Sequence, residues 1–380
     1  MMFLDSPIPP RDYVENPHAH FARWRALSPL HYAPARDLWL VLSYDSVAQL
    51  LRDERLELTN SSSFLERSQA FRSTVVRELR IFFSRLDDIE IDKVLCATVD
   101  RALQRVLDAG YADLVTEIAQ FIPLAVMGHL LGVPDPELRI LQPLSVASII
   151  EYDFSSRSAS LSLGKRFLDA YFLRHLARAQ TAESTPLMRM LVQAQKEHDI
   201  AAPVLADVCS RLLTAGTSTT SGVLANILVR LLQMTPAVVA ELASEGRLPM
   251  LTEELLRLDS SILGIKRLAR CDFDLPGARI KKGQKILLMT AAANRDPSYL
   301  PHPDSIDLAQ AGKRHLTFGQ GEFHCLGAIL ARKEIMAVIR SVVPYLSRLR
   351  LQEAPERRTG WLVYEPVTVR VKTEGECHAH

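Results

Sequence analysis

Apolar residues recur at helical spacing along most of this chain, and segments that alternate as strands do are few and short. Residues 100–131 keep the helical spacing and end at Gly132-Val133-Pro134, which predicts one helix with a clear stop. Residues 204–232 are apolar on nearly every face, which predicts a long helix buried on all sides. The pattern therefore predicts a mainly α fold.

The β structure expected is small. The candidate strands are residues 38–42, 285–290 and 367–371. Proline and glycine punctuate residues 276–327, which should be rich in loops. The polar tail, 373–380, is expected to fray. Because no Gly/Ser-rich or Pro-rich linker divides the chain, we expect residues 1–380 to form a single domain.

Composition narrows the function classes. The 45 basic and 44 acidic residues are spread along the chain, without the basic stripe of a nucleic-acid binder. No unbroken apolar run reaches the ~18 residues of a membrane span, and the start lacks a signal-peptide pattern. The cysteines are Cys96, Cys209, Cys271, Cys325 and Cys377, an odd number at wide spacings. These features predict a cytoplasmic protein without disulfides, nucleic acid or membrane as partners.

One cysteine stands out for its surroundings. Cys325 follows Gly319 and Gly321, which permit a tight turn. It precedes residues 328–339, which read as a helix, so the helix dipole and free N–H groups should favour a thiolate. A lone cysteine in a glycine-rich turn is ordinarily just buried. The ten residues FGQGEFHCLG at 318–327 are too specific for that reading.

A second unusual run lies inside the long predicted helix. It consists of Ala215, Gly216, Thr217, Ser218, Thr219 and Thr220. Glycine in a helix interior costs about 1 kcal/mol relative to alanine, and hydroxyls that bond the preceding turn can bend a helix. The run predicts a local opening with a functional use. The alternative is that the Ser and Thr side chains simply fill a helix–helix interface.

These two segments resemble the cytochrome P-450 superfamily. Residues 318–327 are similar to its cysteine-ligand loop, and residues 215–220 to the part of its long helix that crosses the haem. The resemblance extends over roughly residues 12–371 and is clearest from Ala215 onward. It implies the cytochrome P-450 fold, which is mainly α with small β-sheets and has a long central helix buried over the haem.

The resemblance implies haem b (iron protoporphyrin IX), with the Cys325 thiolate as its axial ligand. The absence of Cys-x-x-Cys-His predicts that the haem is held non-covalently. Gly327 would remove a side chain where a flat macrocycle approaches the backbone. The other haem-binding residues implied are Phe318, Gly319 and Arg267, with Arg77 or Arg80 as a further propionate ligand. A guanidinium suits a propionate because it can pair bidentately.

On the other side of the haem, the resemblance assigns Ala215 and Gly216 to a dioxygen groove and Thr219 to proton delivery. Ser218 stands where the family usually has an acid. A serine can pass protons through water but cannot store one as an acid can. Our hypothesis is that Ser218 slows or alters oxygen activation, so that Ser218→Asp should raise coupled turnover.

Glu254 and Arg257 resemble the family's Glu-x-x-Arg pair, whose spacing places both side chains on one helix face. Their implied role is to lock the loops around the haem, and residues 294–297 are interpreted as structural. Phe323 and Gln310 stand where the family usually has a propionate donor and an arginine for the pair. The usual His-x-x-x-Arg motif is also absent near residues 74–83, where Arg77 fits slightly better than Arg80.

The implied activity is a monooxygenase that inserts one oxygen atom from dioxygen into a lipophilic small molecule, in a specialised-metabolite pathway. Electrons would come from a ferredoxin with its ferredoxin reductase. The candidate docking residues are Lys313, Arg314, Arg332 and Lys333, for which ordinary solvated surface is the alternative. The candidate substrate contacts are residues 60–71, 149–163, 209–213, 260–264 and 362–363.

Two rival interpretations stay open. In the first, a haem-thiolate enzyme without the distal acid uses peroxide, or catalyses coupling, dehydration or isomerisation. Turnover with hydrogen peroxide but not with a reductase system would favour it. In the second, the chain is a non-catalytic haem-binding protein. The presence of Thr219 argues against this second alternative.

Overall fold

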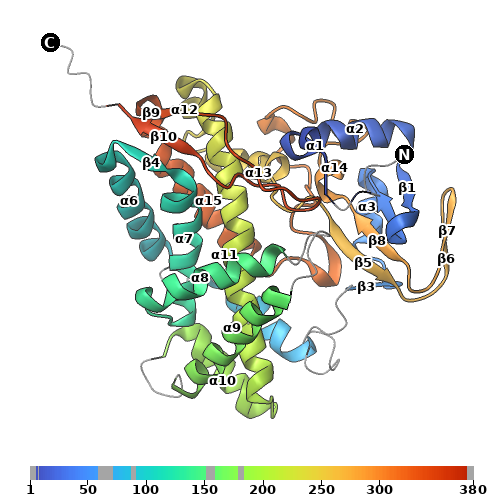
Figure 1. Ribbon diagram of the computed structural model, residues 1–380, viewed down its shortest axis with the longest axis horizontal. Helices are drawn as coiled ribbons and strands as arrows, with labels where there is room; N and C mark the ends of the chain where they lie inside the picture. The colour runs from blue at the N-terminus through green and yellow to red at the C-terminus, as the bar shows by residue number, and fades with distance from the viewer. Residues whose placement is uncertain are drawn as a thin grey trace.

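The computed structural model describes residues 6, 8–58, 72–86, 91–150, 159–178 and 184–374, and the side chains of 72–73, 146–150 and 159–162 lie outside that description. Most helices gather on one side of the molecule, and the largest sheet lies with the N-terminal helices on the other side (Figure 1). The helix α11 runs through the middle between these two parts. This arrangement confirms a mainly α fold with small sheets.

The helices are α1 (Arg11–Glu15), α2 (Pro17–Leu27), α3 (Tyr44–Leu50), α5 (Arg77–Ser84), α6 (Ile91–Ala109), α7 (Phe121–Leu131), α8 (Asp135–Ile150), α9 (Ala159–Arg178), α10 (Pro186–Glu197), α11 (Ala202–Gln233), α12 (Pro236–Leu242), α13 (Leu248–Leu258), α14 (Thr290–Ala293) and α15 (Ala328–Val342). Short 3-10 or π segments are η2 (Pro34–Arg36), η4 (Arg72–Val76), η6 (Val115–Gln120), η7 (Leu308–Gln310), η8 (Gly321–Phe323) and η9 (Val343–Arg348). The strands are β1 (Leu30–Ala33), β2 (Leu38–Val41), β3 (Leu56–Glu57), β4 (Tyr111–Asp113), β5 (Ile265–Ala269), β6 (Phe273–Leu275), β7 (Ala278–Ile280), β8 (Lys285–Leu288), β9 (Leu349–Leu351) and β10 (Arg370–Thr373).

The central helix α11 confirms the long buried helix predicted at 204–232. It has 32 residues and packs against α7, α8 and α9. Among the described helices it is long and apolar enough to cross a membrane, but 67% of its most apolar window is buried inside the protein. Burial on all sides identifies α11 as the core helix around which the bundle is built.

The single helix predicted at 100–131 is wrong. Gly110 takes a left-handed φ of 71° and ends α6, and the next three residues form β4. Strand β4 pairs with β10, whose residues are far away in the sequence, so the local helical spacing could not reveal it. The predicted stop is confirmed, because Gly132 ends α7 with a φ of 65°.

The largest sheet has the strand order β1-β2-β8-β5-β3, with β2 and β8 parallel and the other pairs antiparallel. Strands β2 and β8 confirm the predictions at 38–42 and 285–290. The strand predicted at 367–371 is shifted, because β10 extends to Thr373 and pairs with β4 and β9. The predicted fraying is therefore wrong for Thr373, which is bonded in the sheet, while residues 375–380 lie outside the description.

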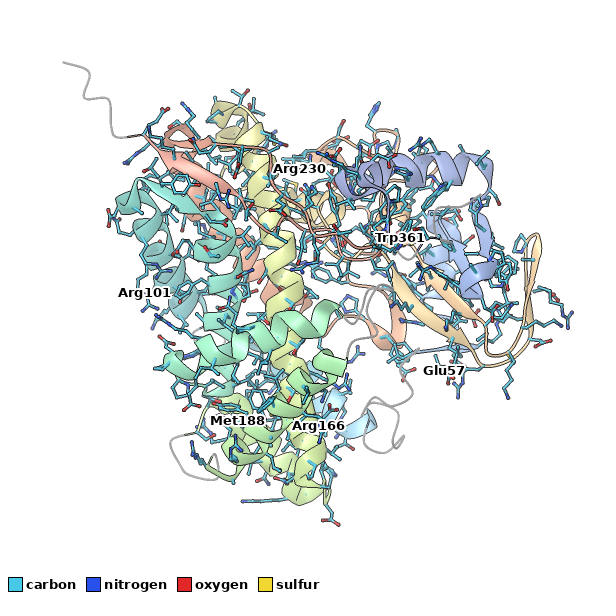
Figure 2. The ribbon with its side chains drawn as sticks, in the orientation of Figure 1. Glu57, Arg101, Arg166, Met188, Arg230 and Trp361 are labelled. Atoms are coloured by element: carbon cyan, nitrogen blue, oxygen red, sulfur yellow. The ribbon has the colours of Figure 1, made fainter. Side chains whose placement is uncertain are left out.

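The hydrophobic core has three parts. The largest joins the helical side, a second joins the N-terminal helices to β1–β2 and the 361–362 segment, and a third lies on the β-sheet around α3. In the second part, the Tyr13 and Trp361 rings lie 4.8 Å apart, and the Tyr13 hydroxyl donates to the Trp361 carbonyl. Figure 2 shows Trp361 on the side of the N-terminal helices, and Arg230 on the C-terminal part of α11. The C-terminal segment is thus fixed between the two sides.

Candidate functional site

The cysteine loop is a tight turn that leads into α15. The Cys325 backbone N–H donates to the Phe318 carbonyl at 2.9 Å, closing the loop on itself. Gly319 and Gly321 have left-handed φ values of 66° and 74°, which only glycine adopts at little cost. Gly321 is also close to the backbone of Leu51, whose oxygen would lie 3.2 Å from a Cβ there. These contacts confirm the turn predicted before the cysteine.

The predicted preference for a thiolate is not what the environment of Cys325 gives. Burial raises the pKa of the thiol, and the Gly327 backbone N–H and the nearby Arg332 only partly oppose it. The thiol nevertheless has solvent-accessible surface, so it is surrounded by protein but not covered by it. The helix-terminus effect is the weaker one here, and a bound metal cation would be what deprotonates this sulfur.

Gly327 shows that the loop has room for a flat group beside Cys325. Its φ of −85° is open to any residue, so the backbone does not require glycine. A Cβ at this position would meet nothing within 4 Å, so protein packing does not require glycine either. The residues therefore fit a planar cofactor that approaches the backbone next to the sulfur.

Arg267 on β5 lies against the same loop. Its side chain is 3% exposed, and its guanidinium lies 5.0 Å from the centre of the Phe323 ring. Arg80 also reaches the loop, because it donates to the Glu322 carbonyl. Arg77 instead pairs with its neighbour Glu78 and is largely exposed. Of the two alternatives near 74–83, the structure thus brings Arg80 to the cysteine loop, although Arg77 was slightly favoured from sequence.

The hydroxyl-rich stretch of α11 does not form a local opening, so that expectation is wrong. Helix α11 is assigned as continuous from Ala202 to Gln233. The Thr217, Thr219 and Ser221 hydroxyls each donate to the carbonyl four residues earlier, at 2.7 Å. These bonds are made within a segment that is helical throughout. What distinguishes this stretch is accessibility, because Ala215 is exposed in the middle of a buried helix.

The Ser218 side chain faces α8, and its hydroxyl is hydrogen-bonded to that helix. Its side chain is 5% exposed, and its hydroxyl donates to the Ser145 carbonyl at 3.2 Å. The Ser145 hydroxyl lies 2.7 Å from that of Thr217, so three hydroxyls join the two helices. This is the interface-filling alternative, realised for Ser218 and Thr217. Gly216 also has a packing role, because a Cβ there would lie 2.6 Å from the Met127 sulfur.

A short segment connects α11 with the cysteine loop. The Ser261 hydroxyl donates to the Thr219 carbonyl at 2.9 Å. A few residues further on, Ile265 lies 3.5 Å from the position of a Cβ on Gly319. The segment 261–267 therefore touches the functional stretch of α11 at one end and the cysteine loop at the other. Sequence reasoning missed Ser145 and Ser261 as partners, because single serines carry no pattern.

The Glu254–Arg257 pair is buried and fully bonded. The two side chains are 2–3% exposed and are joined by two hydrogen bonds of 2.8 and 2.9 Å. The guanidinium also donates to the carbonyls of Asn294, Pro303 and Ser305, and the carboxylate accepts from the Asp307 backbone N–H. Gln310 takes no part, because its amide donates to Asp307. A backbone N–H, that of Asp307, thus binds the Glu254 carboxylate where the family usually has an arginine side chain.

The segment 294–297 is structural, as interpreted. Asn294 is 1% exposed; its amide donates to the Thr317 hydroxyl and its oxygen accepts from the Leu316 N–H. Asp296 is also buried and accepts from the Tyr44 N–H. These bonds fix the chain just before the cysteine loop.

The four basic docking candidates are less available than the sequence suggested. Arg332 forms two bonds to Glu253 and lies over the Phe318 ring, and Lys333 pairs with Asp92. Lys313 donates to the Tyr299 carbonyl at 3.0 Å. Arg314 and Arg332 line a pocket of about 410 Å³ together with Arg52, Lys313 and His324. Burial and the charges of Arg332, Arg80 and Arg314 lower the pKa of His324. Glu253 also lines the pocket, but the four basic side chains outnumber it, so this face is electropositive.

Several substrate-contact candidates are not positioned for that role. Cys209 and Leu213 are fully buried in the largest core, because helical geometry turns them away from Ala215. Leu362 and Val363 are 1% exposed. Ile262 is partly exposed and is bridged to Val363. Residues 60–71 and 151–158, and the side chains of 149, 150 and 159–162, lie outside the described part of the chain.

A mainly α fold, a central helix with an accessible threonine, and a cysteine loop with room beside its sulfur are features that a haem-thiolate protein requires. The family model "Cytochrome P450" matches residues 127–361. The chain belongs to the cytochrome P-450 family.

Individual relatives agree along nearly the whole chain. The biotin biosynthesis cytochrome P-450 of Bacillus subtilis is 23% identical over 373 residues, covering 93% of this chain and 94% of that one. Putative cytochrome P-450 140 of Mycobacterium tuberculosis is 32% identical over 274 residues, covering 68% and 62%. The solved structure of P450BioI, in complex with acyl carrier protein ligated to hexadec-9Z-enoic acid, has a TM-score of 0.86 at 24% identity, covering 96% and 100%.

Membership has direct consequences. The chain is a cytochrome P-450 monooxygenase, an oxidoreductase of a family that binds haem through a cysteine thiolate. Cys325 lies within the residues that the family model matches. Bacterial members generally take electrons from a ferredoxin and its reductase.

Proposed function

We propose that this enzyme inserts one oxygen atom from dioxygen into a lipophilic small molecule, using a non-covalently held haem b. The observation that carries the proposal is the accessible stretch of α11. Ala215 is exposed and Gly216 and Thr219 are partly exposed, although the helix is buried on both sides of them. These side chains are small and uncharged, which suits an apolar substrate.

The residues that would hold the haem follow from the site. Cys325 would ligate the iron, Gly327 would let the macrocycle approach, and Arg267 and Arg80 would pair with propionates. Phe318 and Gly319 shape the loop around the sulfur, since Phe318 accepts the Cys325 N–H and lies against Arg332. When bound, haem supplies the activation of dioxygen and the transfer of its oxygen atom.

Thr219 is the residue proposed to pass protons on the α11 side of the haem site. Its hydroxyl donates to the Ala215 carbonyl at 2.7 Å, which leaves its oxygen lone pairs free to accept. Ala215 and Gly216 would keep the space beside it free of side chains. Ser218 would contribute only by position, because its hydroxyl is bonded to α8.

The substrate class is supported by the relatives. One relative is described as acting in biotin biosynthesis, and a solved neighbour holds a carrier-bound hexadecenoic acid. We infer that the substrate here is also lipophilic and belongs to a specialised biosynthetic pathway. Residues 60–71 and 149–163 remain candidate contacts by resemblance.

The electron donor is proposed to be a ferredoxin supplied by its reductase, in the cytoplasm. The electropositive pocket beside the cysteine loop, with Arg52, Arg314 and Arg332, supports an acidic partner. Residues 1–380 are proposed to act as one domain, since α11 and the C-terminal segment join both sides of the molecule.

A second reaction class is favoured by Ser218. Peroxide-driven oxidation, coupling, dehydration or isomerisation would need fewer protons at this position. The absence of an acid next to Thr219 would therefore limit these reactions less. Turnover with hydrogen peroxide alone, and none with reduced ferredoxin, would select it.

The experiment that tests the proposal is a spectral screen of the haem-loaded protein. Lipophilic compounds, with hexadec-9Z-enoic acid among them, should shift the ferric haem from low to high spin, and the same compounds should gain one oxygen atom with reduced ferredoxin. If polar metabolites alone gave the shift, the proposed substrate class would be contradicted. A loaded protein that shifts with no compound and consumes no dioxygen would support the non-catalytic alternative.

A further inference from the structure

Proton supply is the part of the reaction that the described site leaves unassigned. Inserting one oxygen atom and releasing the other as water consumes two protons. Ser and Thr hydroxyls can pass a proton but cannot store one at neutral pH. Ser218 is further restricted, because it donates to the Ser145 carbonyl. A buried acid elsewhere in the chain could store a proton, and this inference rests on the proposed function.

One face of α11 leads away from Thr219 toward its C-terminal end. Ala215, Thr219, Gly222 and Asn226 follow each other at intervals of three or four residues, so they lie on the same helix face. Gly222 has no side chain, so residues from other segments can approach the helix at this point. Beyond it, Asn226 is hydrogen-bonded to polar groups, so the helix face becomes polar.

Glu365 and Ser261 fill the gap at Gly222. Glu365 Oε2 and Ser261 Oγ both lie within 3.1 Å of the point where a Cβ on Gly222 would stand. The same Ser261 hydroxyl donates to the Thr219 carbonyl at 2.9 Å. A carboxyl group is therefore placed against α11 at Gly222, one helical turn beyond Thr219, beside the serine that bonds the Thr219 carbonyl.

The environment of Glu365 suits a group that gains and loses a proton. Its side chain is 8% exposed, and burial raises its pKa, opposed by the charge and hydrogen bond of Arg358. Arg358 is the charged group that faces it, bonded to Oε1 at 2.6 Å, whereas α11 and the neighbouring turn present the uncharged Gly222 and Ser261. The acid form is thus favoured by burial, and the carboxylate left after donation would be stabilised by Arg358.

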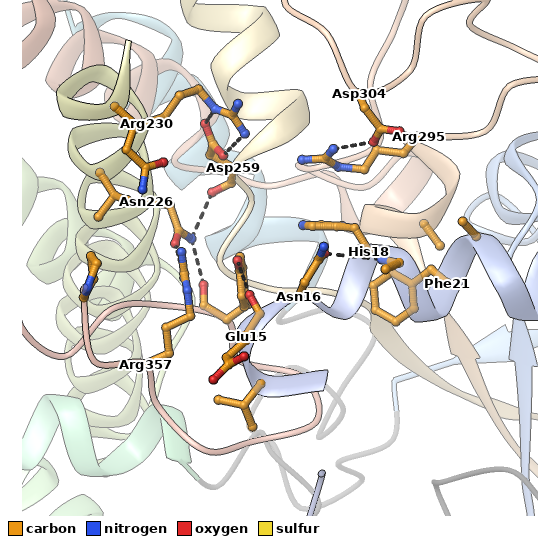
Figure 3. Close-up of a pocket in the computed structure, with 18 of the residues that line it drawn as sticks. Glu15, Asn16, His18, Phe21, Asn226, Arg230, Asp259, Arg295, Asp304 and Arg357 are labelled. Carbon is orange, nitrogen blue, oxygen red and sulfur yellow. Dashed lines mark hydrogen bonds and ion pairs between the residues drawn. The ribbon is translucent and has the colours of Figure 1, made fainter. Parts of the chain in front are cut away.

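A polar pocket adjoins this group and can resupply it. The pocket holds about 1190 Å³ between α1–α2, the C-terminal part of α11 and the 354–364 segment. Figure 3 shows Asn226, Arg357, Asp259 and Arg230 on its wall. Asn226 Nδ2 donates to the Tyr364 carbonyl, next to Glu365, and Arg357 donates to the Asn226 side-chain oxygen.

We propose that Glu365 stores the proton that Thr219 passes on, and that water along the α11 face from the pocket resupplies it. The proton would leave Glu365 Oε2 for a bridging water next to Ser261, and that water would pass a proton to the Thr219 hydroxyl oxygen. The Thr219 hydroxyl proton would go to the oxygen atom that is released as water. Glu365 is left as a carboxylate paired with Arg358 and takes a proton back from pocket water. No electrons move in these steps. Glu365 is a positioning residue that acts through Thr219.

The test compares Glu365→Gln with the control Glu353→Gln, an exposed glutamate paired with Arg370. The full-length haem-loaded protein is reduced with a plant ferredoxin and its reductase, with hexadec-9Z-enoic acid as the probe. Glu365→Gln should lower the rate of dioxygen consumption about tenfold and raise its solvent deuterium isotope effect, because the amide cannot donate an acid proton. The wild-type rate should fall as pH rises through the pKa of Glu365, and the variant should lack that limb. The control should keep the wild-type rate, isotope effect and pH profile.

A second readout needs no turnover. Infrared titration should show carboxylic acid absorbance that persists above the ordinary glutamate range near about 4.3. Because burial also raises the pKa of Glu334, the readout is the difference spectrum between the wild type and Glu365→Gln, which should contain one such band. If the variant loses no such band, or keeps the wild-type isotope effect and pH profile, the inference is overturned. If the band is present but the loaded protein consumes no dioxygen, the proposed function fails instead, and the use of Glu365 as a proton store falls with it.

Discussion

The two sides of the site are built on different principles. On the cysteine side, the buried Glu254–Arg257 pair is bonded throughout, mostly to backbone groups of the chain that leads to the loop. On the α11 side, hydroxyls bridge helices, and the Glu365 carboxyl comes from the far end of the chain. The first side is specified by motifs within one stretch of sequence. The second exists only once distant segments have packed.

This difference bears on what each side can do. Fully bonded buried charges hold a geometry and tolerate no loss of a partner. Hydroxyls and a protonated carboxyl can each both donate and accept a hydrogen bond, as proton movement requires. The predictions below test whether the cysteine side is a fixed frame and the α11 side an adjustable one.

The largest effect is expected for Arg257→Leu. Removing the guanidinium leaves the Glu254 carboxylate buried without its partner, so the free energy of unfolding should fall by about 3–5 kcal/mol. Urea unfolding measures it. Arg370→Leu, which breaks the exposed pair with Glu353, is the control and should cost less than about 1 kcal/mol. If both variants lost the same free energy of unfolding, the buried pair would not hold the cysteine side in a fixed geometry.

Two glycines give a matched contrast between the sides. Gly216→Ala places a Cβ against Met127 and should destabilise the fold by about 1–3 kcal/mol. Gly327→Ala meets no protein atom, so the haem-free protein should change by less than about 0.5 kcal/mol. Haem binding, measured by titration, should weaken in Gly327→Ala. Unchanged haem affinity there would show that the macrocycle does not approach this residue.

Acid should loosen the cysteine side first. Burial raises the pKa of Glu253, but bonds from Arg332 and His315 outweigh it and lower that pKa to about 2. Because the folded pKa is lower than the unfolded one, this stabilisation is present above about pH 4.5 and is lost as pH falls toward 2. It should amount to about 1–2 kcal/mol, since the group is partly exposed. Glu253→Gln should flatten the stability profile between these values; an unchanged profile would contradict this assignment.

The smallest effect is expected for Ser218→Asp. A carboxyl beside Thr219 adds a second proton store, so coupled turnover should rise about two- to fivefold. The gain should be larger in a Glu365→Gln background, where the first store is lost. A cost of about 1 kcal/mol in stability should accompany it, because the carboxylate meets the Ser145 carbonyl. The measurement is the amount of product formed per electron consumed. If this ratio does not rise in either background, residue 218 has no role in proton delivery.

Much of the cysteine side could be predicted from the sequence, because its determinants are local. The turn before Cys325, the start of α15 and the spacing of Glu254 and Arg257 all lie within short stretches. The raised pKa of the Cys325 thiol could not be predicted, since it depends on burial that the whole fold creates. The choice between Arg77 and Arg80 likewise depends on which one the packed α5 turns toward the loop.

On the α11 side, the sequence predicted the helix and Thr219 but not their partners. Ser145, Ser261 and Glu365 are ordinary residues in their own segments, and only tertiary packing brings them to α11. Strand β4 was missed for the same reason, because its pairing partner β10 is remote in sequence. Local patterns identify elements; long-range pairing decides what those elements meet.

The central claim is that the Cys325 sulfur ligates the haem iron. The most direct measurement is the absorbance of the reduced, carbon-monoxide-treated, haem-loaded protein, compared with Cys325→His. The wild type should show the long-wavelength band that gives the family its name, and the variant should show the shorter-wavelength band of a histidine-ligated haem. A folded and loaded wild type without the long-wavelength band would contradict the account.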